Sequence, residues 1–270
     1  MRLISRLFFC AVVAATTARA TVVNGDLAVN SFAAYAGQTN IVLQATGNIV
    51  FTGGTLNLPT LPPGAVNGLL TVQAGNDVVV NDGVTIVAGA GWSVAMVAGT
   101  TDFGSNPAVT PGTGNINFPG SGSLVTIDGS ISLLAGNNVT VAGGTIGTAG
   151  GGDMTITALA GSVSIGMGNL PGQIGTVDGG SISISAGGNV SGIITGTITN
   201  ITAGGIVTIP AGPGIPINGG CNNHPHNDNG CLHNVQHPDG IFDAGCRSNP
   251  FGSRQFAPSY RPELVQFRRH

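Results

Sequence analysis

A short motif recurs along most of this chain. It consists of an apolar strand, an Ala-Gly or Thr-Gly corner usually followed by Asn, and a second apolar strand. The copies are LQATGNIVF from Leu43, VQAGNDVVV from Val72, LLAGNNVTV from Leu133, ISAGGNVSG from Ile184 and ITAGGIVTI from Ile201. A further corner is Ala160-Gly161. Self-similarity at roughly 20 to 30 residues is typical of solenoids, in which each coil packs on its neighbours.

Within each copy, apolar residues alternate with small polar residues. Ile131 and Leu133 are separated by Ser132, and Val139 and Val141 by Thr140. This period of two predicts short strands with one buried face. Strands that end at Gly or Asn and recur in this way fit the coils of a parallel β-helix, of which residues 21–212 would form about eight or nine. We expect the recurring Asn48, Asn76, Asn137 and Asn189 to stack in ladders along the rod.

The composition agrees with an all-β fold. The chain contains 46 glycines among 270 residues. It has no Lys and a single Glu, so residues that favour helices are scarce and a helical bundle is excluded. An antiparallel sandwich is the alternative architecture, because it also uses short strands separated by turns such as Asp82-Gly83 and Asp128-Gly129.

These repeats resemble those of filamentous-haemagglutinin-like adhesins and related bacterial β-helical surface proteins, over about residues 41–209. The resemblance implies a right-handed parallel β-helix, export across the bacterial envelope, and a role in adhesion or surface structure. The chain departs from those adhesins in lacking an Asn-Pro-Asn secretion motif, since Asn106-Pro107 and Asn249-Pro250 are bare Asn-Pro pairs.

The N-terminus has the pattern of a secretory signal peptide. Arg2 and Arg6 precede an apolar run from Leu7 to Ala15, and Ala18-Arg19-Ala20 provides a cleavage site. We therefore expect residues 1–20 to be removed and the mature chain to be secreted to the cell surface or the extracellular space. No later stretch is apolar for long enough to span a membrane as a helix.

Charge divides the mature chain into two parts. Residues 21–212 contain seven Asp and no Lys or Arg, whereas residues 213–270 contain five Arg, three Asp and one Glu. An acidic body without cations repels phosphate backbones, so nucleic acid is excluded as a partner. We expect three segments: the signal peptide (1–20), the parallel β-helix body (21–212), and an irregular Cys/His-rich segment with a basic aromatic tail (213–270).

Two stretches interrupt the periodic pattern. Residues 99–122 contain three prolines and no clean alternation, which predicts a loop that protrudes from one coil. Residues 59–68 have the same character. Loops on a rigid scaffold often carry function but also tolerate neutral insertions, and the sequence leaves both open.

The body offers little catalytic chemistry. The carboxylate pairs that a glycoside hydrolase would need are Asp77 with Asp82, or Asp153 with Asp178. Most of these Asp residues adjoin Gly or Asn, where turn formation explains them, so we expect no enzyme and no catalytic residues. Thr195, Thr197, Thr199 and Thr202 suggest a regular array of the kind that orders water, although Thr is also an ordinary outward strand residue.

The C-terminal segment from Cys221 to Cys246 holds the sharpest chemical cluster. It contains all three mature cysteines and four of the five histidines: Cys221, Cys231, Cys246, His224, His226, His233 and His237. Thiolate and imidazole are natural zinc ligands, but secreted cysteines usually form disulfides. We expect a disulfide between two of the three cysteines, with a zinc site as the alternative and otherwise no cofactor.

Arg247 to His270 holds every mature arginine together with four aromatic residues. We expect this tail to cap the open end of the solenoid, or else to dock on an acidic partner or on a neighbouring copy. The functional expectation is a non-enzymatic adhesion or structural module that contacts a host-cell, matrix or polysaccharide surface or associates with itself. The alternative is a carbohydrate-active β-helix that binds or cleaves polysaccharide.

Overall fold

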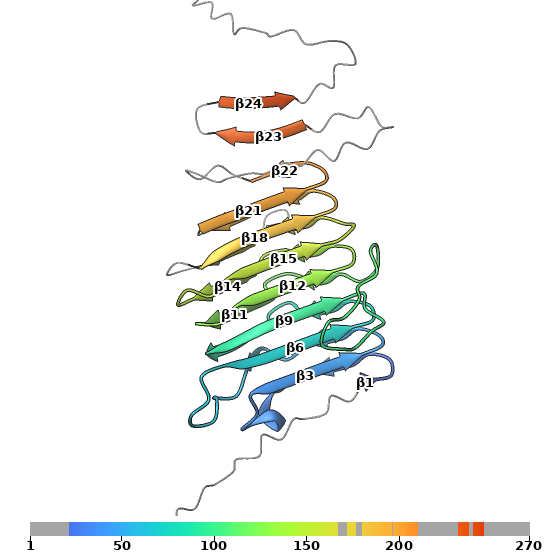
Figure 1. Cartoon of the computed structure of the whole chain (residues 1–270), viewed down its shortest axis with the longest axis vertical. Helices are drawn as coiled ribbons and strands as arrows, with labels where there is room; N and C mark the ends of the chain where they lie inside the picture. Colours follow the sequence, from blue (N-terminus) through green and yellow to red (C-terminus); the bar gives the residue numbers. More distant parts are fainter. Residues whose placement is uncertain are drawn as a thin grey trace, which may run out of the picture.

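Three parallel sheets wind into a β-helix, as the repeats predict (Figure 1). The computed structural model describes residues 22–166, 172–176, 180–195 and 197–209, together with strands β23 (Leu232–His237) and β24 (Gly240–Gly245). In the described part the only helical element is the 3-10 turn η1 (Ala33–Tyr35). All pairings between the strands of the three sheets are parallel, which excludes the antiparallel sandwich.

The chain visits the three sheets in turn on each coil. Sheet A comprises, in spatial order, β1 (Val22–Val23), β3 (Asn40–Ala45), β6 (Gly68–Ala74), β9 (Trp92–Ala98), β12 (Ile131–Ala135), β15 (Met154–Ala158), β18 (Ser181–Ala186) and β21 (Thr197–Ala203). Sheet B comprises β2 (Leu27–Val29), β4 (Ile49–Phe51), β7 (Val78–Val80), β10 (Ile116–Phe118), β13 (Val139–Val141), β16 (Val163–Ile165), β19 (Val190–Ser191) and β22 (Val207–Thr208). Sheet C comprises β5 (Thr55–Asn57), β8 (Thr85–Ala90), β11 (Ser123–Ile127), β14 (Thr145–Ala149), β17 (Gln173–Thr176) and β20 (Ile193–Thr195).

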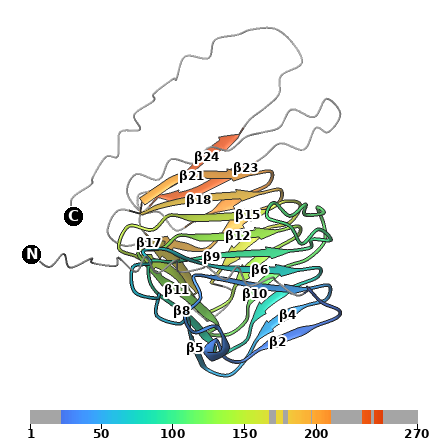
Figure 2. The ribbon, with the colours of Figure 1, turned by 60° about the horizontal axis from the view of Figure 1, so that its bottom comes forward.

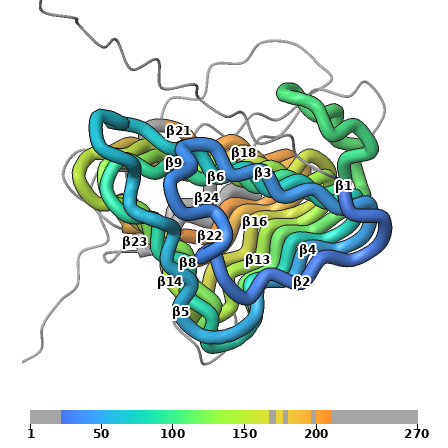
Figure 3. Tube along the Cα trace, turned by 90° about the horizontal axis from the view of Figure 1, so that it is seen from below, coloured from blue at the N-terminus to red at the C-terminus, as the bar shows by residue number. Residues whose placement is uncertain are grey.

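The stacked coils form a three-sided prism when they are viewed along the axis (Figure 3). Sheet A is one wall, and the view of Figure 2 brings the strands of sheet C forward beside it. Sheets A and B each contain eight strands, so the described body has eight coils, within the predicted eight or nine.

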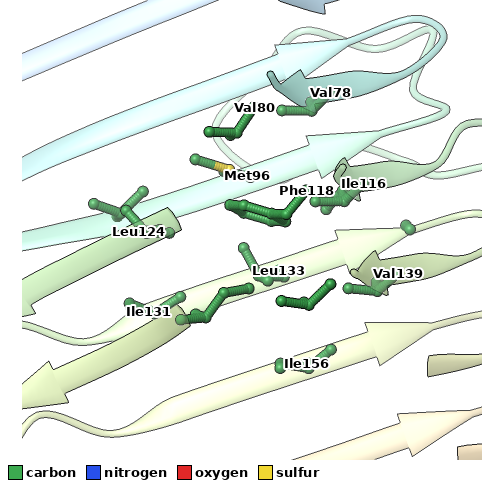
Figure 4. Packing of buried hydrophobic residues seen from close by; sticks show 14 of the residues in the cluster. Val78, Val80, Met96, Ile116, Phe118, Leu124, Ile131, Leu133, Val139 and Ile156 are labelled. Atoms are coloured by element: carbon green, nitrogen blue, oxygen red, sulfur yellow. The ribbon is translucent and has the colours of Figure 1, made fainter. Parts of the chain in front are cut away.

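The interior is built from columns of identical or similar apolar residues (Figure 4). Leu133 of β12 lies between Met96 of β9 and Ile156 of β15, and all three are fully buried. At the end of sheet A the inward column is alanine on seven successive coils: Ala45, Ala74, Ala98, Ala135, Ala158, Ala186 and Ala203. The small side chain suits this position, because the chain turns there into the narrow corner between sheets A and B. Residue Ala158, and not the expected Ala160, occupies the column on its coil.

The N-terminal end of the core is closed by an aromatic residue. Phe32 precedes η1 and is only 2% exposed. Its ring centroid lies 6.3 Å from that of Tyr35 and 6.3 Å from that of Phe51 in β4, on the second coil. This segment replaces a sheet C strand on the first coil, so Phe32 covers apolar residues that would otherwise face solvent at the end of the solenoid.

The interruptions lie where the sequence places them, with one correction. Residues 59–67 form no strand, as expected. The expected loop over residues 99–122 is shorter, because it contains β10 and because β11 begins at Ser123. Only residues 99–115 form the loop between β9 and β10, which projects from the body in Figure 1. Three alternating residues, Ile116 to Phe118, are too few to stand out from a Pro- and Gly-rich neighbourhood.

Beyond the body, β23 and β24 pair as an antiparallel hairpin. The expected signal peptide lies outside the described residues. No helix in the described part of the chain is long and apolar enough to cross a membrane.

Candidate functional site

A ladder of short polar side chains runs along the corner between sheets A and B. On each coil a side-chain oxygen accepts a hydrogen bond from the backbone N–H of the corner residue one coil further on. Asn48 Oδ1 accepts from the N–H of Asp77 at 3.1 Å, and Asp77 Oδ1 accepts from that of Asn115 at 2.7 Å. The complete series is Asp26, Asn48, Asp77, Asn115, Asn138, Ser162, Asn189 and, as the last donor, Ile206.

The predicted ladder therefore exists, but its membership differs from the expectation. Asn48 and Asn189 are members, whereas Asn76 is not, since the neighbouring Asp77 holds that position. Asn137 takes part only by donating its Nδ2 to Asn115 Oδ1 at 3.1 Å. Asn115, which lies directly before β10, was missed because it belongs to the stretch expected to be an irregular loop.

Two more aspartates serve the other corners. Asp82, between sheets B and C, accepts from the backbone N–H and the hydroxyl of Ser121 at 2.8 and 2.9 Å. Asp153, between sheets C and A, accepts in the same way from Ser181 at 2.9 and 2.7 Å. Hydrogen bonds from the serine N–H, followed by those from the serine hydroxyl, lower the pKa of both carboxyl groups. A lowered pKa keeps each carboxylate ionised and is opposite to the raised pKa of a glycosidase acid.

Of the two expected carboxylate pairs, only Asp77 with Asp82 lies wholly within the described residues, and its two members belong to different corners. Asp77 belongs to the corner between sheets A and B, whereas Asp82 follows the other end of β7, at the next corner. Asp153 is engaged by Ser181, and Asp178 lies outside the described residues.

The outward face of sheet A carries ordered columns of small polar residues. Ser132, Thr155 and Ser183 are paired in register on successive coils, and so are Thr157, Ser185 and Thr202. Ser132, Thr155 and Ser185 are exposed. The four threonines of residues 195–202 do not lie on one sheet, because Thr195 belongs to sheet C whereas residues 197–202 belong to sheet A.

The loop at residues 99–115 is clamped to sheet A by two buried glutamines. Gln44 and Gln73 point outward from β3 and β6, yet they are only 5% and 2% exposed. Gln44 Nε2 donates to Gln73 Oε1 at 2.6 Å and to the carbonyl oxygen of Phe103 at 2.8 Å. Gln73 Nε2 donates to the carbonyl oxygen of Gly104 at 2.8 Å. The clamp folds the loop over the ends of β3 and β6, which removes part of this face from solvent.

A cavity of about 440 Å³ lies between the irregular segment 58–67 and the corner that joins β8 to β9. We call it the Trp92 cavity, because the single tryptophan of the chain lines it. Trp92 Nε1 donates to the carbonyl oxygen of Pro59 at 2.8 Å, which fastens the segment to the corner. Gly91 has a φ of +79°, and a Cβ there would come within 2.5 Å of the carbonyl oxygen of Val66, so the close approach requires glycine.

Asp128, on the next coil, also lines the Trp92 cavity. Its φ of 59° makes it the only non-glycine residue in the left-handed region among the described residues. Asp adopts this conformation more readily than most residues, but it is still strained. The side chain lies against Gly150, where a Cβ would collide with Asp128 Oδ1. Sequence reasoning treated Asp128 as a turn residue, and neither Asp128 nor Trp92 was expected to form a site.

The predicted Cys/His cluster cannot be compared with this geometry. Cys221, Cys231, Cys246, His224 and His226 lie outside the described residues. His233 and His237 belong to β23, of which the backbone pairing with β24 is described. The disulfide and the zinc site therefore stay predictions. Within the described ranges no group of three or more His, Cys, Asp or Glu residues is placed to hold a metal ion.

No family model matches the chain, and no curated protein and no solved structure matches it.

Proposed function

We propose that the chain is a secreted, non-enzymatic β-helix protein that acts at a cell surface or in the extracellular space as an adhesion or structural module. The main observation behind a non-enzymatic role is that most of the described carboxylates stabilise the fold. Asp26, Asp77, Asp82 and Asp153 all accept hydrogen bonds from the backbone of the next coil, which holds the coils together. The resemblance of the repeats to filamentous-haemagglutinin-like adhesins supports the same role.

Sheet A is the surface we assign to adhesion. Its central strands β6 and β9 are seven residues long, whereas no strand of sheet B exceeds three residues and none of sheet C exceeds six, so sheet A has the longest strands of the three walls. Its outward Ser and Thr columns repeat at the spacing of the coils, about 4.8 Å. A repeating row of hydroxyl groups suits a partner that itself repeats, such as a matrix or polysaccharide surface.

The test measures adhesion of beads coated with mature chain (residues 21–270) to a panel of matrix proteins and polysaccharides. The double variant Thr155→Asp/Ser185→Asp places charges on the outward face of sheet A. The control Thr140→Asp/Ser164→Asp places them on the outward positions of sheet B. We expect loss of adhesion in the first variant alone, with both variants keeping the circular dichroism of the parent.

Adhesion by neither the parent nor the control, or equal loss in both variants, would overturn the proposal. Release of new reducing ends from any polysaccharide would replace it with the carbohydrate-active alternative. Secretion is tested separately: deletion of residues 1–20 is expected to leave the protein in the cytoplasm, and secretion of the truncated chain would contradict the localisation.

A further inference from the structure

The Trp92 cavity has the size and the walls of a small-ligand site. Its volume of about 440 Å³ lies within the range of ligand pockets in proteins. Its lining includes Leu61 and Val66 from segment 58–67 and Ala90 at the end of β8. Leu61 also packs against the corner, since a Cβ on Gly91 would lie 3.1 Å from its Cδ1. The walls therefore fit a ligand with an apolar body.

Exposed apolar residues also lie in the lining of the cavity or close to lining residues. Val66 lines it and is 79% exposed, the largest value among the large apolar residues of the described part. Ile127 directly precedes Asp128, pairs with the lining residue Ala90 and is 43% exposed. Leu69 follows Gly68 at the end of the segment and is 41% exposed. Exposed apolar residues gathered at a cavity commonly mark a binding site.

The negative charge of Asp128 favours a cationic ligand in this cavity. Asp128 is exposed, and no described residue forms a hydrogen bond or an ion pair with its carboxylate. No Lys or Arg occurs between Arg19 and Arg247, so the body itself supplies no fixed cation to pair with Asp128. The left-handed backbone and the contact with Gly150 hold this carboxylate in one place. An anionic ligand would meet uncompensated negative charge throughout the body, whereas a cation would be attracted.

We propose that the Trp92 cavity binds a small primary amine with an aromatic or aliphatic body, with the ammonium group beside Asp128 and the body against Leu61 and Val66. This site is separate from the outward Ser and Thr columns of sheet A. It does not depend on the adhesion proposal, and its failure would leave that proposal intact.

Three ligands of one shape separate charge from packing: phenethylamine, phenethyl alcohol and phenylacetate. Each is titrated into the mature full chain while the fluorescence of Trp92 is recorded, because the chain has no other tryptophan. Isothermal titration calorimetry provides an independent measurement. We expect saturable binding of the amine, weaker binding of the alcohol and no binding of the acid.

Two variants and one control identify the site. Asp128→Asn removes the charge while Asn keeps the left-handed backbone, and we expect it to weaken the amine three- to fivefold, about what an exposed ion pair contributes, without changing the alcohol. Ala65→Phe fills the cavity from the segment and is expected to abolish binding of both ligands. Asp102→Asn removes an equal charge from the loop at residues 99–115 and is expected to change neither affinity.

Three results would overturn the proposal. The first is absence of saturable amine binding by the parent chain. The second is binding of phenylacetate as tight as that of the amine. The third is amine affinity that is equal in the parent and the Asp128→Asn variant. An Ala65→Phe variant that binds like the parent would place any observed site elsewhere and would equally refute the assignment.

Discussion

Removal of Asn115 is the most direct way to measure what the corner ladder contributes to stability. The Asn115 side chain makes four hydrogen bonds that alanine cannot make. Its Nδ2 donates to Asp77 Oδ1 at 3.0 Å. Its Oδ1 accepts from Asn137 Nδ2 at 3.1 Å, and from the N–H and the Nδ2 of Asn138, both at 3.2 Å. Asn115→Ala therefore breaks the ladder in the middle of the solenoid.

The expected cost follows from these four contacts. A hydrogen bond in a folded protein contributes about 1 kcal/mol net, and a donor left without a partner costs more. The site is half-buried, so water replaces some of the lost partners. We expect the Asn115→Ala variant to lose about 2–3 kcal/mol of the free energy of unfolding.

The assay is urea denaturation, followed by circular dichroism for the whole body and by Trp92 fluorescence for the coil just before the loop at residues 99–115. Agreement of the two probes shows whether one transition describes the solenoid, since repeat proteins can unfold in parts. The control is Asn117→Ala, which makes the same substitution two residues away. Asn117 points outward from β10, is half-buried, and forms no side-chain hydrogen bond with a described residue.

We expect Asn117→Ala to change the free energy of unfolding by less than about 0.5 kcal/mol. If Asn115→Ala and Asn117→Ala have the same midpoint and slope, the ladder contributes nothing measurable. The assignment of the corner carboxylates to a structural role would then lose its energetic basis.

Two further perturbations test the other corners and the glutamine clamp. The folded-state pKa of Asp82 and of Asp153 is lowered by hydrogen bonds from Ser121 and Ser181, so their contribution to stability is complete above the ordinary Asp pKa and is lost as the pH falls through the folded-state value. The urea concentration at the denaturation midpoint of the parent should therefore decrease as the pH is lowered below about 4, and it should decrease less in the double variant Asp82→Asn/Asp153→Asn. Parallel plots of midpoint against pH for the two proteins would contradict this. Gln73→Leu removes the hydrogen bonds to Gln44 and Gly104 that hold the loop at residues 99–115. In limited proteolysis followed by mass spectrometry, we expect this loop to be cleaved faster in Gln73→Leu than in the control Thr71→Val. Equal cleavage rates would show that the two glutamines do not hold the loop.

The body of the fold could be predicted from its repeats, because a parallel β-helix applies the same packing rule to every coil. Alternation such as Ile131, Ser132 and Leu133 identifies the strand and its buried face at once. The exact register was less accessible. The corner after β15 is one residue longer than those after β12 and β18, so an Ala-Gly pair does not mark the column there, and only the pairing of β15 with β12 identifies Ala158 as its member.

The Trp92 cavity could not be predicted from the sequence for a different reason. It is formed by an irregular segment folded back on a corner one coil later, and Asp128 reaches it from the following coil. Contacts between irregular segments follow no period. The only local signals were a single tryptophan and an Asp-Gly pair, and the second is equally typical of an ordinary turn.

The chemistry of the ladder also explains why its members are not all asparagine. The donor on each coil is a backbone N–H, which any non-proline residue provides, so the side chain must supply only an acceptor at a short distance from the backbone. Asn, Asp and Ser all satisfy this requirement, which accounts for Asn48, Asp77 and Ser162 in one series. Ile206 is the last member of the series because its side chain has no hydrogen-bond acceptor. Its N–H donates to Asn189 Oδ1 at 2.8 Å, but its own side chain offers no acceptor to a following coil. Within the described residues the ladder therefore ends at Ile206, and its continuation to a further coil would require an acceptor at this position.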